Sequence, residues 1–161
     1  MVEAKIHAVN ATKYPADKAD KWSALPLDND QWTLSHNALR LEIRSMIHAL
    51  ETFIGRLKDG DNIPDWVVKT VQEWWKSHTD HATDHCKSEE SMYKPLLSER
   101  FKWPAVIDEL HDTLDSVQNK VQVAVMDGLN NEKSSLVAVK DALVTYEETM
   151  LKHFEVEETT A

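Results

Sequence analysis

The sequence predicts an all-α fold, namely an up-down-up-down antiparallel four-helix bundle with an N-terminal arm. The chain of 161 residues fits one domain and contains only three glycines and five prolines. Strong helix formers dominate, and stretches that alternate β-branched or aromatic residues with polar ones are scarce. Four segments carry apolar residues at helical spacing, and the short breaks between them favour antiparallel neighbours.

The first helix follows a polar N-terminal segment. Residues 1–31 lack a sustained apolar period and predict an arm, so that the bundle occupies residues 32–161. The first helix is expected from residue 33 to residue 58, and the turn-forming residues 59–62 end it.

Proline and glycine mark the limits of the other three helices. The second helix opens with Pro64 in its first turn, and we expect Pro95 and the segment 97–103 to stop it. The third helix begins near Pro104. A break at residues 127–131 separates it from the fourth helix, which starts near Ser134.

Composition excludes several classes of function. The formal net charge is −10 and the pI is near 5.2, so the surface repels phosphate backbones and anionic lipid, and we expect no nucleic acid and no membrane as partner. A single cysteine, Cys86, excludes an internal disulfide framework and a cysteine-based zinc finger. No apolar run is long enough for a signal peptide or a membrane span, so we expect a cytoplasmic protein.

Each predicted helix places one histidine in its apolar face, and these are His36, His85, His111 and His153. One buried histidine is usually a hydrogen-bonded core residue. One in every helix needs a shared explanation, because an imidazole is costly to bury without partners. Residues at equal height in an antiparallel hairpin lie symmetrically about its connection. Each consecutive pair of these histidines is centred in or beside a predicted break, so the four imidazoles should share one layer.

Two glutamates supply the neighbouring layer. Glu89 follows His85 by four residues, and Glu157 follows His153 by four, so each glutamate lies on the face of its histidine, about 6 Å further along the axis. Two buried carboxylates that face each other repel unless cations lie between them. Imidazole and carboxylate donors suit iron, manganese or zinc, and two carboxylates flanked by histidines suit a dinuclear centre. The Glu-x-x-His signature of ferritin-like bundles and the zincin motif are both absent.

At these residues the chain resembles the hemerythrin-like (HHE cation-binding) family over about residues 31–158. The matching segments are SHNALR at 35–40, WWKSHTDHATDHCKSEESMYKP at 74–95, His111, and HFEVEE at 153–158. The resemblance implies a left-twisted four-helix bundle with a di-iron site that interacts with O₂. By position, it implies six metal ligands, which are His36, His85, Glu89, His111, His153 and Glu157. We therefore expect two non-haem iron (Fe) ions with an oxo or hydroxo bridge, and Zn or Mn as alternatives.

The chain departs from the family pattern at two positions. Oxygen-carrying members have a His-x-x-x-His pair on the third helix, and here Ile107 stands at its first position. His81, one turn before His85, is either a substitute ligand, a supporting residue hydrogen-bonded to Asp115, or a residue that lines a solvent channel. Cys86 stands where relatives often have a second histidine, and we expect it to point about a quarter-turn away from the site.

Three functions follow from these observations. We favour a metal-binding protein that binds or senses O₂ or handles iron, without catalytic residues of its own. The alternative is a di-iron oxidoreductase that acts on O₂, peroxide or nitric oxide, which an unsaturated iron near Ile107 would favour. A second alternative is a metal-free helical interaction module.

Overall fold

The computed structural model describes residues 31–58, 60–100 and 102–160. Their helices are α3 (Gln31–Ile54), α4 (Asp65–Ser88), η3 (Glu89–Tyr93), α5 (Lys94–Ser98), α6 (Ala105–Val123), η4 (Ala124–Gly128) and α7 (Lys133–Thr160). Within those residues there is no strand, so the predicted all-α class is confirmed. The predicted arm lies outside the described residues, except for Gln31, which begins α3.

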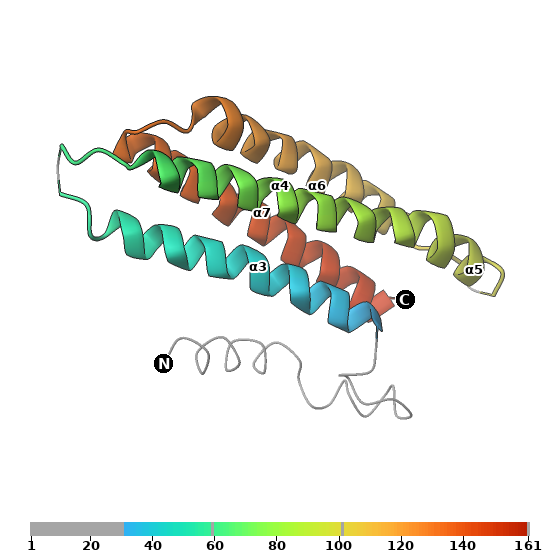
Figure 1. Ribbon diagram of the computed structural model, residues 1–161. Coiled ribbons are helices and arrows are strands. Elements are labelled where there is room, and N and C mark those ends of the chain that lie inside the picture. The colour runs from blue at the N-terminus through green and yellow to red at the C-terminus, as the bar shows by residue number, and fades with distance from the viewer. Residues whose placement is uncertain (1–30, 59, 101, 161) are drawn as a thin grey trace.

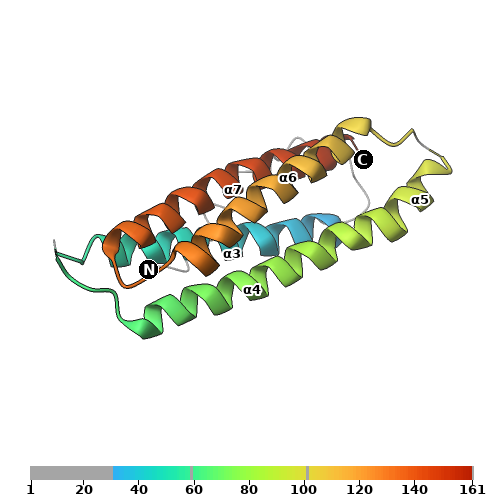
Figure 2. The same cartoon turned by 90° about the horizontal axis from the view of Figure 1, so that it is seen from above.

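These helices form four long helical segments, which are α3, α4 with η3 and α5, α6 with η4, and α7. The segments lie alongside one another (Figures 1 and 2). Helix α6 packs along α7, α7 packs along α3, and α4 contacts α3, whereas α4 and α6 approach each other less closely. The connections that follow α3 and η4 lie at one end of the molecule, and the connection that follows α5 lies at the other (Figure 1). Among the described residues, no helix is both long enough and apolar enough to span a membrane.

A pair of hydrogen bonds joins the two connections that lie at the same end. The backbone N–H of Ile63 donates to the carbonyl oxygen of Asn131 at 2.8 Å. The side-chain amide of Asn131 donates in return to the carbonyl oxygen of Ile63 at 2.6 Å. Because these residues lie far apart in the sequence, the pair holds the first connection against the third.

The second helical segment ends at Ser98, within the predicted stop segment 97–103. The expectation that Pro95 contributes to this stop is wrong, because α5 carries the helix past Pro95. Proline has no N–H to donate and its ring crowds the preceding turn of a regular α-helix. Here the preceding turn is the wider π-helix η3, in which the N–H of Lys94 donates to the carbonyl of Glu89. This wider turn accommodates the proline without ending the helix, and it starts at a predicted metal ligand.

Apolar side chains from all four segments fill the space between the helices. The largest fully buried ones include Trp75, Tyr146, Phe154, Leu39, Ile43, Leu136, Leu143 and Met150. This core holds the helices at fixed spacing over most of their length, and the polar site is embedded at one end of it.

Truncation of a core side chain should destabilise the fold. Leu143 is 0 % exposed, so Leu143→Ala leaves a cavity and should lower the free energy of unfolding by about 2–5 kcal/mol. Val123 is 58 % exposed, and Val123→Ala should change it by less than about 0.5 kcal/mol. Urea denaturation of the two variants measures the difference. Equal midpoints would contradict the position of the core.

Candidate metal centre

The six residues predicted as metal ligands come together at one end of the helices. They are His36 of α3, His85 of α4, Glu89 at the start of η3, His111 of α6, and His153 and Glu157 of α7. His36, Glu89, His153 and Glu157 are 0 % exposed, and His111 is also buried. The four imidazoles therefore lie in one cluster, to which each long helical segment contributes.

Glu89 lies between histidines of three different helices. Its Oε1 atom lies 2.8 Å from Nε2 of His85 and 3.6 Å from Nε2 of His36. Its Oε2 atom lies 3.4 Å from Nε2 of His111. The two oxygens thus face different imidazoles, which is the arrangement by which one carboxylate can bridge two metal ions.

Glu157 faces the same group of imidazoles from α7. Its Oε2 atom lies 3.2 Å from Nε2 of His36 and 3.2 Å from Nε2 of His153. Its Oε1 atom lies 3.8 Å from Nε2 of His111. The two buried carboxylates therefore share two of their histidine neighbours, His36 and His111.

These contacts are ion-pair distances, and most of the facing atoms make no hydrogen bond of suitable geometry within the described part of the chain. They are Nε2 of His85, both ring nitrogens of His111 and His153, and both carboxylate oxygens of Glu89 and Glu157. A buried polar atom without a hydrogen bond costs about 1–3 kcal/mol, and more when it is charged. Such a cluster of convergent donor atoms is costly in a core but suited to a cation.

The pKa values of the histidines diverge. Burial lowers the pKa of His36, but the facing carboxylates of Glu157, Glu158 and Glu89 outweigh it and raise the pKa to about 10. Burial, together with the neighbouring imidazoles, lowers the pKa of His153 to about 3. Without a metal, one imidazole of the layer is therefore a cation and another is neutral at neutral pH.

The pKa values of the two glutamates diverge as well. Burial raises the pKa of Glu89, but the facing imidazoles of His111, His36 and His85 outweigh it and hold the pKa well below its usual range. Burial raises the pKa of Glu157, and the charge of Glu89 adds to the effect. Cations between the carboxylates would remove this conflict.

The donor atoms form two groups that share Glu89. One group is His36, His85, Glu89 and Glu157, and the other is Cys86, Glu89, His111 and His153. Within each group the donor atoms lie within 4.8 Å of one another.

Cys86 belongs to the second of these groups, so the expectation that it points away from the site is wrong. One feature of the sequence does indicate the true direction of this side chain. Cys86 lies three residues before Glu89, and residues three apart are neighbours on a helix. Burial and the charges of Glu89 and Glu157 raise the pKa of the Cys86 thiol.

His81 belongs to neither group. Its Nδ1 atom lies 2.9 Å from Oε1 of Glu42, whose Oε2 lies 2.8 Å from Nδ1 of His78. The expected hydrogen bond from His81 to Asp115 is therefore wrong, and the partner comes from α3. At 38 % side-chain exposure, His81 lies at the surface.

Side chains around His36 hold its ring in place. Nδ1 of His36 lies 2.8 Å from Oε1 of Glu158, and a guanidinium nitrogen of Arg40 lies 2.8 Å from the same oxygen. The ring of Phe154 stacks on the imidazole with 4.0 Å between centroids. A carboxylate on the second ring nitrogen is the usual way in which a metal-binding histidine is oriented.

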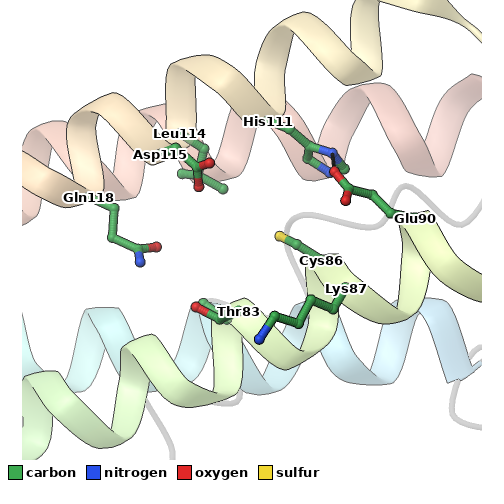
Figure 3. Close-up of a pocket in the computed structure, with 9 residues that line it drawn as sticks. Thr83, Cys86, Lys87, Glu90, His111, Leu114, Asp115 and Gln118 are labelled. Atoms are coloured by element: carbon green, nitrogen blue, oxygen red, sulfur yellow. Dashed lines mark ion pairs between the residues drawn. The ribbon is translucent and has the colours of Figure 1, made fainter.

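A pocket of about 190 Å³ lies between α4 and α6, the two helices that approach each other less closely. Cys86 and His111 line its wall together with Glu90, Lys87, Asp115 and Gln118. The sulfur of Cys86 and the ring of His111 project into the same space from opposite helices (Figure 3). One side of the donor cluster therefore borders the pocket.

Comparison of the chain with protein families, with curated proteins and with solved structures gave no match. The resemblance to the hemerythrin-like family therefore stays a prediction from the residues, and the site is defined by its own geometry. That geometry is a buried cluster of histidine and carboxylate donors, with one thiol beside it.

The affinity of the metal-free protein for Co²⁺ should rise between about pH 6 and pH 9. Because the pKa of His36 is about 10, the ring is protonated over this range, and an incoming ion has to displace that proton. The affinity should gain about tenfold per pH unit for each proton displaced. Titration calorimetry in non-coordinating buffers measures the slope, and a flat profile would show that no protonated ligand is displaced.

Proposed function

We propose that the protein is a hemerythrin-like bundle that binds two non-haem iron ions and thereby binds or senses O₂ or handles iron in the cytoplasm. The observation that supports this most directly is the pair of buried carboxylates, Glu89 and Glu157, facing imidazoles from α3, α4, α6 and α7. A metal-free protein would bury these groups at a cost that a structural role does not explain.

The fold supports the proposal through the order of its connections. These alternate between the two ends of the molecule (Figure 1), as an up-down-up-down antiparallel bundle requires. In this proposal the helices from α3 to α7 form the bundle.

The donor set supports iron, although zinc and manganese accept the same donors. Each group of donors contains two imidazoles and at least one carboxylate. When bound, iron supplies redox chemistry and affinity for O₂ or a similar small ligand. The chain itself supplies the buried surroundings, the orientation of His36 through Glu158, and access through the pocket beside His111.

Removal of one imidazole should remove the metal and its stabilising effect. Aerobically purified protein should contain about two irons per chain and show near-ultraviolet ligand-to-metal charge-transfer bands. His85→Ala should lose these bands and melt at a lower temperature, because a ligand that binds only the folded state stabilises it. His48→Ala is the matched control, since His48 is exposed and lies in neither donor group. Elemental analysis, absorption spectra and thermal melting provide the measurements.

Other results would select another function. One zinc or manganese per chain would retain the metal centre and remove O₂ chemistry. No metal after loading, with His85→Ala melting like the parent, would leave the metal-free helical interaction module.

The pocket is the observation that favours the second candidate, a di-iron oxidoreductase. It reaches the cluster at Cys86 and His111, and Ile107 stands where oxygen carriers of the family have a histidine. The iron-loaded protein should then consume hydrogen peroxide, and Gln118→Trp, which fills the pocket, should slow turnover at unchanged iron content. Turnover no faster than that of free iron would favour the binding role.

A further inference from the structure

The position of Cys86 on α4 places its sulfur beside the donor cluster. At about 100° per residue, Glu89 lies about 40° from His85 and about 60° from Cys86 around the helix axis. The carboxylate therefore projects between the imidazole on one side and the thiol on the other. Each of the two flanking side chains belongs to a different donor group, and Glu89 belongs to both.

We propose that Cys86 is a thiolate ligand of one of two metal ions, which it binds together with Glu89, His111 and His153. The sulfur and one donor atom from each of the other three side chains lie within 4.8 Å of one another. This inference rests on the proposed metal centre and deepens it, because it names the donors of each ion. The other ion takes His36, His85, Glu89 and Glu157.

The histidines of this group supply independent support. His153 is 0 % exposed, and neither of its ring nitrogens makes a hydrogen bond in the described structure. The ring of His111 lies 4.6 Å from that of His153 between centroids, and its nitrogens are also without hydrogen bonds. Two such imidazoles, a carboxylate and a sulfur are enough donors for a four-coordinate ion.

The thiol of Cys86 on α4 also supplies a donor that α6 lacks at residue 107. Ile107 is fully buried one turn before His111 and offers no donor atom. An ion bound at His111 and His153 therefore needs another ligand, and Cys86 enters the space beside His111 from the opposite helix (Figure 3).

Charge balance favours a thiolate as well. Two divalent ions bring four positive charges into a buried site, and Glu89 and Glu157 neutralise only two of them. A thiolate neutralises a third, which lowers the cost of burial. On binding, the S–H bond breaks, a sulfur–metal bond forms, and the proton leaves to water through the pocket. No electron is transferred.

Cobalt(II) tests the assignment, because a cobalt–thiolate bond produces a near-ultraviolet charge-transfer band that nitrogen and oxygen ligands do not produce. The metal-free full chain should develop this band as Co²⁺ is added. Cys86→Ala should lack the band and bind one of its two ions more than about tenfold more weakly, since loss of even an outer-shell partner costs roughly 10–100-fold. Cys86→Ser should also lack the band.

Thr83→Ala is the matched control. Thr83 lies one turn before Cys86 and lines the same pocket, but it belongs to neither donor group. The variant should keep the sulfur band and both affinities. A second measurement needs no variant: Co²⁺ bound to the parent protein should slow the reaction of the thiol with a maleimide.

The outcomes separate the two proposals. Two bound Co²⁺ ions without a sulfur band, with Cys86→Ala unchanged in affinity, would make Cys86 a packing residue and leave the metal centre intact. No Co²⁺ bound to the parent protein would remove the metal centre and the thiolate ligand together.

Discussion

The rest of the structure depends on the burial of two carboxylates, Glu89 and Glu157, against one group of imidazoles. Neither side chain reaches solvent, and the charge of Glu89 disfavours ionisation of Glu157. Such a pair needs positive charge nearby, from protons on histidines or from metal ions. The carboxylates raise the pKa of both His36 and His111, so protons on these two rings supply part of the positive charge, whereas burial keeps His153 neutral at ordinary pH. This imbalance is the physical reason for placing cations in the cluster.

The surrounding fold supplies the rigidity that such a site requires. Apolar side chains hold the four long helical segments together along their length, so the donors at one end are positioned by packing that involves no metal. At Glu89 the regular α-helix gives way to the π-helix η3, and π-helical turns occur frequently at functional sites. On the opposite side, Glu158 and Phe154 fix the ring of His36. These contacts hold the donor atoms close together.

The sequence predicted the height of each donor along the helices better than its direction around them. Helical rise converts a sequence offset into height, so spacing about the connections was enough to bring the six residues into one cluster. Direction depends on how the helices rotate and approach one another. Cys86 was misplaced because its angle was judged from His85 alone, although Glu89 lies between them. The sequence places Asp115 at the height of His81 across the second connection, but the actual partner, Glu42, comes from α3 across the first connection. Pro95 does not stop the helix because the π-helical turn before it accommodates the ring, and that turn has no sequence signal of its own.

The two sides of the cluster differ in access, and this difference limits what the site can do. His36 and Glu157 are sealed by the helices and by Phe154, so an ion held there exchanges little with solvent. Cys86 and His111 border the pocket between α4 and α6, so a small ligand reaches the cluster on their side first. If the sulfur binds metal, that ion is the more accessible of the two and the one with the softer donor. Whether the site only binds a small molecule or also reacts with it would then depend on Cys86 and the residues around it, next to the pocket.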